Sequence, residues 1–292
     1  MKVLITGRNG QLGGDLLATA PGAMEITAND VDELDITDAS QVDELVSGLQ
    51  PEVIINAAAY TAVDKAESEP DLARAVNATG PANLATAAKS AGSFLIHVST
   101  DFVFDGNKSS PWQPGDPVNP VGEYGKTKAE GEQLVREILG EHSLILRTSW
   151  VYSVHGHNFV KTMLRLMQER DEVRVVSDQV GSPTWSRNLA RVIWELIEKK
   201  APSGIYHWSD AGKTSWYDFA CAIYEEGRRT GLVQREVNMV PITTDQYPTP
   251  ARRPAYSVLD TTGTQKLLGH APQPWREALR EMLTELSVRG EY

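Results

Sequence analysis

The 292-residue chain contains a single cysteine, and this scarcity excludes a fold held together by internal disulfide bonds. That cysteine, Cys221, stands inside an apolar run, which predicts a small buried side chain rather than a nucleophile. Histidine is also scarce, with six residues, and only His155 and His157 lie close together in the sequence. Their spacing within a glycine-containing loop is not typical of a metal site.

The sequence also lacks a long hydrophobic run and an excess of positive charge. No stretch approaches the ~18 consecutive apolar residues of a membrane span, and the net charge of −11 disfavours nucleic acid as a partner. After Met1 and Lys2 the chain enters a short apolar run that does not resemble a secretory signal. We therefore expect a cytoplasmic protein that binds neither nucleic acid nor membrane.

The first pattern that is present is a strand, a glycine turn and a helix. Lys2–Thr6 is a short apolar run, and Gly7, Gly10 and Gly13 follow it with the spacing of a dinucleotide-binding turn. A helix predicted over Gln11–Ala20 would direct its N-terminus at the phosphates. An ordinary glycine-rich turn is the alternative, but the position of the turn favours a nucleotide site.

An acidic residue follows the second predicted strand. This strand covers Met24–Ala28, and Asp30 comes just after it. In dinucleotide sites an acid at this place holds the ribose hydroxyls, although a capping or turn aspartate is the alternative. Asp35 and Ile36, after the next turn, are candidates to border the adenine.

Three further apolar runs predict strands that end in small or polar residues. They are Val53–Asn56, Phe94–Ser99 and Ser143–Thr148, and a helix predicted over Asp71–Ala91 connects the first two. Open α/β sheets bind ligands at the carboxyl ends of their strands. We therefore expect a site built from the residues at these ends, which are Ala58, Ala59, Tyr60, Thr61, Val98, Thr100, Asp101 and Trp150.

Tyr124 and Lys128 are four residues apart, so on a helix they share one face. A phenol with a pKa of about 10 is a weak acid at neutral pH, and a neighbouring ammonium group favours the phenolate. Tyr124 is thus predicted to protonate an oxygen that gains charge during a reaction. The same spacing occurs on many solvated helices, so its meaning depends on the nucleotide-binding pattern upstream.

After residue 150 the alternation of strands and helices loosens. The second half is predicted to contain helices at His157–Glu169, Thr184–Lys200, Trp216–Arg229 and Trp275–Arg289, and strands at Val173–Val176 and Gly204–Trp208. Trp194 and Trp208 are predicted to lie in the core. We expect an α/β fold with a Rossmann-type doubly wound parallel sheet over residues 1–150. A smaller substrate-binding lobe over residues 151–292 would pack on it or interleave with it.

Longer blocks make a family resemblance specific. The glycine turn, Ser99-Thr100 and the Tyr124/Lys128 pair together resemble the extended short-chain dehydrogenase/reductase superfamily. Residues 56–67, 99–105, 147–152 and 247–254 resemble the dTDP-4-dehydrorhamnose reductase family, and the resemblance extends from residue 2 to about residue 285.

This resemblance implies NADPH- or NADH-dependent reduction of the C4 keto group of dTDP-4-dehydro-L-rhamnose to dTDP-L-rhamnose. Tyr124 would protonate the C4 oxygen, Thr100 would hydrogen-bond it, and Lys128 would hold the nicotinamide ribose. The other implied substrate contacts are Asp101, Trp150 and either Arg252 or Arg253 at the diphosphate, two solvated loop arginines being the alternative.

The resemblance also implies a cofactor site. Asp30 at the adenosine ribose favours NADH, whereas Arg8 would attract the 2′-phosphate of NADPH, so both cofactors stay open. The implied cofactor residues are Gly7, Asn9, Gly10, Gln11 and Leu12 at the phosphates, Asp30, Asp35 and Ile36 at the adenosine, and Ala58, Ala59, Tyr60, Thr61, Val98, Tyr124 and Lys128 at the nicotinamide.

Metal use and assembly stay open. Some members of the resembled family hold magnesium with acidic side chains at a dimer contact, and Asp15 matches one such ligand. Arg187 stands where a second acid is expected, so we assign no metal residue. Monomer and homodimer are both compatible with the sequence.

Alternatives on the same scaffold are another nucleotide-sugar reductase, an epimerase, a dehydratase, or a non-catalytic nucleotide-binding regulatory subunit. The complete set of Thr100, Tyr124 and Lys128 argues against a non-catalytic subunit. Similar dehydratases carry an Asp-Glu pair after the threonine, whereas this chain has Asp101-Phe102, and a phenyl ring cannot transfer a proton.

Overall fold

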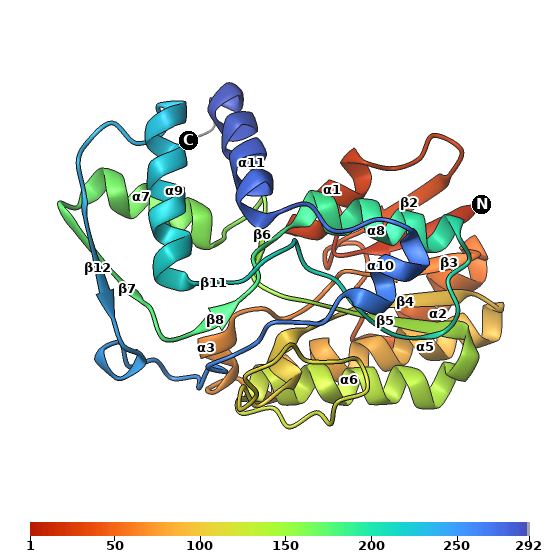
Figure 1. Cartoon of the computed structure of the whole chain (residues 1–292). Coiled ribbons are helices and arrows are strands. Elements are labelled where there is room, and N and C mark those ends of the chain that lie inside the picture. Colours follow the sequence, from red (N-terminus) through yellow and green to blue (C-terminus); the bar gives the residue numbers. More distant parts are fainter. Residues whose placement is uncertain (291–292) are drawn as a thin grey trace.

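Six parallel strands form the central sheet of residues 1–290, the part of the chain that the structure, a computed structural model, describes (Figure 1). The strand order is β10-β5-β4-β3-β1-β2, so the direction of winding reverses between β1 and β3. The strands are β1 (Lys2–Thr6), β2 (Glu25–Asn29), β3 (Val53–Asn56), β4 (Phe94–Thr100), β5 (Ser143–Thr148) and β10 (Gly204–His207). A crevice at such a reversal is the usual ligand site of an open α/β sheet.

Helices cover both faces of this sheet, as Figure 1 shows. One face carries α1 (Gln11–Ala18) and α8 (Ser186–Glu198), and the other carries α2 (Ala39–Leu49), α5 (Gly80–Ala91) and α6 (Glu123–Leu139). Because successive strand residues point to opposite faces, Val3 and Ile5 enter the core with α1 and α8, whereas Leu4 enters the core with α2 and α5. The predicted doubly wound α/β fold is confirmed.

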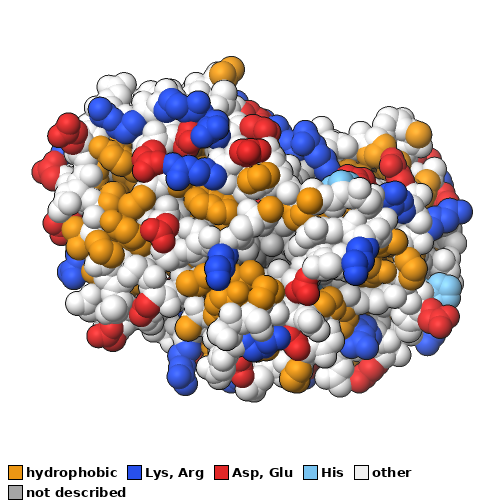
Figure 2. Space-filling view, in the orientation of Figure 1, with side chains coloured by type: hydrophobic (Ala, Val, Ile, Leu, Met, Phe, Trp, Pro, Cys, Tyr) orange, Lys and Arg blue, Asp and Glu red, His pale blue; other side chains and the backbone are white. Residues whose placement is uncertain are grey.

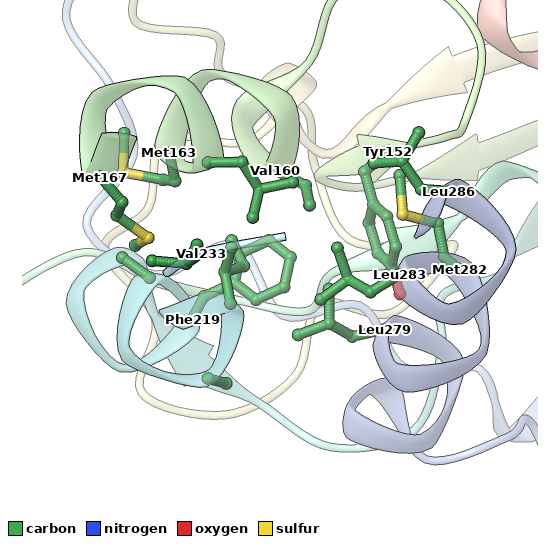
Figure 3. Packing of buried hydrophobic residues seen from close by; sticks show 14 of the residues in the cluster. Tyr152, Val160, Met163, Met167, Phe219, Val233, Leu279, Met282, Leu283 and Leu286 are labelled. Carbon is green, nitrogen blue, oxygen red and sulfur yellow. The ribbon is translucent and has the colours of Figure 1, made fainter. Parts of the chain in front are cut away.

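A smaller lobe lies beyond the carboxyl ends of the strands. Its elements are α7 (Phe159–Glu169), α9 (Trp216–Thr230), α11 (Trp275–Arg289), and two parallel strands, β7 (Glu172–Val176) and β12 (Asn238–Ile242). Figure 3 shows its core, in which Met163 of α7, Phe219 of α9 and Leu283 of α11 point toward one another. Each helix turns an apolar face inward and none could bury that face alone, so the three pack together.

The two halves of the sequence are interleaved in space. Both α8 and β10 follow residue 150, yet α8 packs against α1, and β10 pairs with β5 as the sixth strand of the sheet. Two short strand pairs lie between the sheet and the lobe: β6 (Val151–Tyr152) pairs with β9 (Thr184–Trp185), and β8 (Val180–Gly181) pairs with β11 (Thr214–Ser215). Helix α10 (Thr262–Leu268) packs beside β10.

Several predicted elements differ in detail from the structure. The helix predicted over residues 71–91 is divided into α4 (Pro70–Arg74), a π-helical turn (Ala75–Thr79) and α5. That turn aims the Asn77 side chain at the backbone of Tyr60, where its Oδ1 accepts from the amide at 2.9 Å. The helix predicted from Thr184 begins at Ser186, because Thr184 and Trp185 pair with β6. Helix α2, strand β12 and helix α10 were not predicted.

Three residues after position 150 were predicted to be buried, and the structure agrees for the two tryptophans but not for the cysteine. Trp194 and Trp208 are buried as expected. Cys221 is only partly buried on α9, so the prediction of a buried side chain is wrong. Partial burial raises the pKa of its thiol, which suits an unreactive cysteine.

Figure 2 shows acidic and basic side chains dispersed over one face of the molecule, with small groups of hydrophobic side chains between them. In the described part of the chain, no helix combines the length and the apolar character needed to cross a bilayer.

Candidate functional site

A cavity of about 1540 Å³ opens at the carboxyl ends of the central strands and extends toward the smaller lobe. Its walls include residues from both parts of the molecule, which suits a ligand longer than a cofactor alone. The predicted site residues that line it are Gly7, Asn9, Gly10, Gln11, Leu12, Asp30, Asp35, Ile36, Ala58, Ala59, Tyr60, Thr61, Val98, Thr100, Asp101, Tyr124, Lys128, Trp150 and Arg253.

The glycine turn at one end of the cavity has no room for side chains. Gly7 has φ +77°, and a Cβ placed on it would lie 2.8 Å from the backbone of Ala58. A Cβ on Gly13 would lie 2.1 Å from the carbonyl oxygen of Gly7, so only glycine lets α1 approach the turn. Gly10 caps α1 without a side-chain hydrogen bond, which leaves the N-terminal amides of the helix available for an anion.

Asp30 closes the turn from the end of β2. Its carboxylate oxygens accept hydrogen bonds from the backbone amides of Asn9 and Val31, both at 2.8 Å. Arg8 forms an ion pair with Glu33 at 2.7 Å. The acid and the base that the sequence placed beside the ribose therefore both lie at this edge, and the base already has an acidic partner.

Thr100 and Tyr124 meet at the end of β4. The Thr100 hydroxyl donates to Asp101 at 3.0 Å and accepts from the backbone amide of Phe102 at 3.2 Å. Burial raises the pKa of Tyr124 to about 12, while a hydrogen bond with Thr100 lowers it and the Asp101 charge raises it. The sequence predicted a net effect in the opposite direction. That prediction is wrong, because taking a phenolate out of water outweighs the favourable contacts.

Lys128 is buried one helical turn beyond Tyr124. Its Nζ donates to the carbonyl oxygen of Val98 at 2.7 Å and lies 3.5 Å from Nε2 of His97. Burial lowers the pKa of Lys128 to about 8, and the negative charge of Glu132 partly offsets that effect. Lys128 therefore lies close to the point at which it changes charge at physiological pH.

A buried ion pair supports this face of α6, and the sequence analysis missed it. Glu132 lies one turn beyond Lys128 and accepts from Arg147 of β5 at 2.6 and 2.9 Å and from Ser99 of β4 at 2.5 Å. An arginine in the otherwise apolar run of β5 was the signal that could have revealed it, since a buried guanidinium requires an anion.

Asp101 and Trp150 form the wall toward the smaller lobe. Burial raises the pKa of Asp101 to about 6, although hydrogen bonds from Ser257 and Thr100 act to lower it. Its Oδ2 is buried without a hydrogen-bond partner among residues 1–290. Trp150 has φ +46° and stacks on Trp216, with 3.5 Å between ring centroids. A buried acceptor and a flat ring at this place suit a polar ring-shaped ligand such as a sugar.

The two predicted loop arginines are separated by the structure. Arg253 lines the cavity, and its guanidinium binds Asp64 at 2.8 Å. Arg252 is exposed and does not line the cavity. Of the pair, Arg253 is the arginine placed to meet an anionic ligand.

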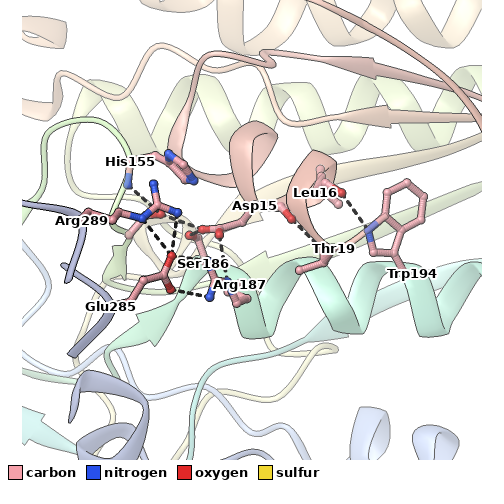
Figure 4. A network of polar contacts seen from close by, with 10 residues as sticks. Asp15, Leu16, Thr19, His155, Ser186, Arg187, Trp194, Glu285 and Arg289 are labelled. Atoms are coloured by element: carbon pink, nitrogen blue, oxygen red, sulfur yellow. Dashed lines mark hydrogen bonds and ion pairs between the residues drawn. The ribbon is translucent and has the colours of Figure 1, made fainter. Parts of the chain in front are cut away.

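The residues around Asp15 do not fit a metal ion. Asp15 is fully buried and accepts from Ser153 at 2.7 Å and from Ser186, and its Oδ1 lies 3.4 Å from the Arg187 guanidinium (Figure 4). Arg187 also binds Glu285 of α11, at 2.8 Å from one carboxylate oxygen. A fixed cation thus already lies between the two acids. Nowhere in residues 1–290 do three or more histidine, cysteine or acidic side chains form a group suited to a metal.

Comparisons with known proteins agree over nearly the whole chain. A family model described as the RmlD substrate binding domain matches residues 1–288. A dTDP-4-dehydrorhamnose reductase of Aggregatibacter actinomycetemcomitans is 46% identical over 288 residues, which cover 96% of this chain and 98% of the relative.

Two solved structures are similar throughout. A dTDP-4-dehydrorhamnose reductase of Clostridium acetobutylicum is 44% identical with a TM-score of 0.92, covering 98% of this chain and 99% of that one. The enzyme of Bacillus anthracis, solved in complex with NADP, is 40% identical with a TM-score of 0.92, covering 97% and 99%.

Proposed function

This chain belongs to the dTDP-4-dehydrorhamnose reductase family, and from that membership we infer an NADPH- or NADH-dependent oxidoreductase that reduces the C4 keto group of dTDP-4-dehydro-L-rhamnose. The product is dTDP-L-rhamnose, a precursor of cell-surface polysaccharide. The observation that carries the assignment is the meeting of Thr100 and Tyr124 at the end of β4, in one cavity with the glycine turn. The complex of one relative supports the cofactor, since the Bacillus anthracis enzyme was solved with NADP.

The cofactor half of the cavity binds the dinucleotide through shape and backbone amides. We propose that the N-terminus of α1 holds the pyrophosphate, that Asp30 holds the adenosine ribose, and that Asp35 and Ile36 border the adenine. The loop after β3 borders the nicotinamide, and Asn77 fixes this loop by bonding both the amide and the carbonyl of Tyr60.

When bound, the reduced nicotinamide supplies the hydride for C4. Tyr124 donates its phenolic proton to the C4 oxygen as negative charge develops there, so hydride and proton together convert the ketone to a hydroxyl. Thr100 orients that oxygen through its own hydroxyl, and Lys128 holds the nicotinamide ribose. Because burial raises the pKa of Tyr124, the phenol keeps its proton until an alkoxide forms, an oxygen basic enough to take it.

The other half of the cavity orients the sugar nucleotide. We propose that Asp101 accepts a sugar hydroxyl, that the Trp150 ring lies along the sugar, and that Arg253 contacts the diphosphate while Asp64 holds its guanidinium in place. Phe102 packs edge-on against Tyr124, with 5.5 Å between ring centroids. A phenyl ring therefore occupies the place where similar dehydratases carry a second acid, which favours reduction over dehydration.

A coupled assay tests the activity. Purified protein supplied with dTDP-4-dehydrorhamnose should oxidise one NADPH for each sugar reduced, and Tyr124→Phe should lower kcat by ~10²–10⁴-fold while NADPH still binds. With dTDP-glucose and no added reductant, no 4-keto sugar should form. Formation of that product would assign the protein to the dehydratases instead.

We further infer that the reduction takes place in the cytoplasm, where reduced nicotinamides and nucleotide sugars are made. Monomer and homodimer both remain predictions for the assembly, and analytical ultracentrifugation distinguishes them.

A further inference from the structure

A histidine with no role in the proposed reaction lies directly behind the proposed catalytic lysine. His97 stands in the middle of β4 and is completely buried. Its Nε2 lies 3.5 Å from Nζ of Lys128, and its Nδ1 lies 3.0 Å from Nδ2 of Asn56 on β3. Burial and the neighbouring Lys128 charge hold the pKa of His97 well below its usual range, so the imidazole is neutral and carries one proton.

The position of that proton follows from the groups around Asn56. The side-chain Oδ1 of Asn56 accepts from the backbone amide of Ala58 at 3.2 Å and from the hydroxyl of Thr6 at 2.8 Å. A backbone amide can only donate, so this end of the Asn56 side chain is the oxygen. The other end is the NH₂ group, which donates to Nδ1 of His97. Nδ1 is therefore an acceptor, and the imidazole proton is on Nε2.

This tautomer points an N–H group at Lys128. A neutral amine has a lone pair that can accept the Nε2–H, whereas an ammonium group has only donors. His97 thus favours the neutral form of the lysine. Glu132, one turn away on α6, favours the charged form and is itself shared with Arg147 of β5.

The remaining neighbours of Lys128 do not decide between its two forms. The Val98 carbonyl accepts from Nζ in either form. On the same helix face Tyr124 stays protonated, because burial raises the pKa of its phenol to about 12. Burial is the main cause that favours the neutral amine of Lys128. Among the neighbouring side chains, His97 adds to that preference and Glu132 opposes it.

We propose that His97 is a positioning residue that stabilises the neutral amine of Lys128 through its Nε2–H and thereby lets Lys128 return a proton to Tyr124 after each reduction. Tyr124 loses its proton to the C4 oxygen and becomes a phenolate. The Lys128 ammonium then gives one proton to the phenolate, directly or through a bridging hydroxyl group. The resulting amine accepts the hydrogen bond from His97 until water restores its proton. The proposal rests on the roles inferred above for Tyr124 and Lys128.

The tautomer can be measured without any enzymatic activity. Nitrogen-15 NMR of labelled protein distinguishes a protonated Nε2 from a protonated Nδ1, and triple-resonance assignment of the unaltered protein identifies the His97 signals. We expect a neutral ring protonated at Nε2 from pH 6 to 9. A proton on Nδ1, or an imidazolium at pH 7, overturns the proposal even if the reductase activity is established.

A matched pair of variants tests the effect on Lys128. Glutamine can donate a hydrogen bond through its side-chain amide and methionine of similar size cannot, so His97→Gln should keep the function that His97→Met loses. In His97→Met we expect kcat to fall about tenfold, the KM for NADPH to stay within about twofold, and the alkaline limb of the pH–kcat profile to move up by about one unit, because the neutral amine is less stable.

Both variants are first checked for folding by circular dichroism and by NADPH binding. Equal kcat values and superimposable pH profiles for the two folded variants overturn the proposal. If neither variant folds, the tautomer measured in the unaltered protein decides. A wild-type protein that does not reduce the sugar nucleotide would count against the proposed function and leaves the NMR result to judge His97.

Discussion

Two ionic clusters lie in the interior of this protein, and they differ in depth and in what they join. Glu132 and Arg147 connect α6 to β5 within the sheet, with side chains only 5% and 2% exposed. Asp15, Arg187 and Glu285 connect α1 to α8 and α11, and there Asp15 is fully buried whereas the Arg187 and Glu285 side chains are 18% and 22% exposed. The first cluster lies between the sheet and α6, the helix that carries the proposed catalytic pair, and the second lies where the sheet meets the smaller lobe.

The difference shows that a buried ion pair can either hold a proposed catalytic side chain in position or attach one part of the molecule to another. Glu132 is one helical turn from Lys128, so a shift of its ion pair moves the proposed catalytic face directly. The cluster at Arg187 begins on α1, the helix whose first turn is proposed to bind phosphate, and ends on the last helix of the smaller lobe. We expect the first cluster to control kcat and stability together, and the second to control stability and cofactor affinity.

The largest effect is expected from Arg147→Met. Methionine leaves the Glu132 carboxylate buried without a cation, and breaking such a pair costs about 3–5 kcal/mol. The urea midpoint should fall and kcat should fall with it. The double variant Glu132→Gln/Arg147→Met removes both charges and should recover most of the stability. If the single variant is as stable as the double variant, the carboxylate is not buried as described.

Asp101 differs from the acids of both clusters, because it is buried without a neighbouring cation in the described part of the chain. Burial raises the pKa of Asp101 from its ordinary 3.8 to about 6, so the folded protein holds this proton more tightly than the unfolded chain. Its contribution to stability is therefore present below pH 4 and is lost as the pH rises through about 6.

The variant Asp101→Asn should be more stable than the wild type at pH 7, by on the order of 2 kcal/mol, and should reduce the sugar more slowly. The stability difference should shrink as the pH falls from 6 to 4, in urea titrations at each pH. A difference that does not change over this range would mean that Asp101 does not titrate there.

A smaller effect is expected from Arg187→Met, because water reaches the Arg187 and Glu285 side chains and the buried Asp15 keeps its hydrogen bonds from Ser153 and Ser186. We expect a loss of about 1–2 kcal/mol, a higher KM for NADPH, and kcat within about twofold of the wild type. Arg187→Lys is the matched control that keeps the charge.

Metal dependence provides a second measurement on the same cluster. Because the Arg187 guanidinium already lies between Asp15 and Glu285, neither Mg²⁺ nor a chelator should change the wild-type urea midpoint. A midpoint that rises with Mg²⁺ would show that a divalent ion binds despite the guanidinium.

The smallest effect concerns the exposed ion pair of Arg8 and Glu33, in which each side chain is 39% exposed. Such pairs contribute ~0–1 kcal/mol to stability, so Glu33→Gln should leave the urea midpoint unchanged while freeing Arg8 for a 2′-phosphate.

Asp30→Ala removes a repulsive carboxylate and should raise the preference for NADPH over NADH about tenfold. Steady-state kinetics with both cofactors measure this ratio, and an unchanged ratio would show that Asp30 does not contact the ribose.

Local patterns predicted most of the sheet but not its outermost pairing. Five apolar runs followed by helices or small residues were enough for β1 to β5. A strand over Gly204–Trp208 was predicted, and β10 covers Gly204–His207, yet nothing in so short a run indicates that it pairs with β5. The π-helical turn at Ala75–Thr79 was also not predictable, because it depends on contacts of Asn77 with Tyr60 and Thr127.

For the site, the sequence placed the residues that end strands and missed those behind them. Of the residues predicted to contact the cofactor or the substrate, all except Arg8 and Arg252 line the cavity, since the carboxyl ends of parallel strands lie at one edge of the sheet. His97, Glu132 and Arg147 were missed because each depends on a partner in another element. A glutamate on a helix is typical of a solvated face until a buried arginine is known to lie against it.

Strand β10 follows its partner β5 late in the sequence, and this order has a consequence during synthesis on the ribosome. The outer edge of β5 exposes unpaired N–H and C=O groups until translation has passed α7 and α8 and reached Gly204–His207. A nascent chain that has emerged only as far as β5 therefore presents an unpaired strand edge, the kind of surface on which other chains aggregate. Once β10 has paired, α10 packs beside it. A fragment ending near residue 150 should accordingly be insoluble when expressed alone, and a stalled ribosome should expose the same edge to chaperones.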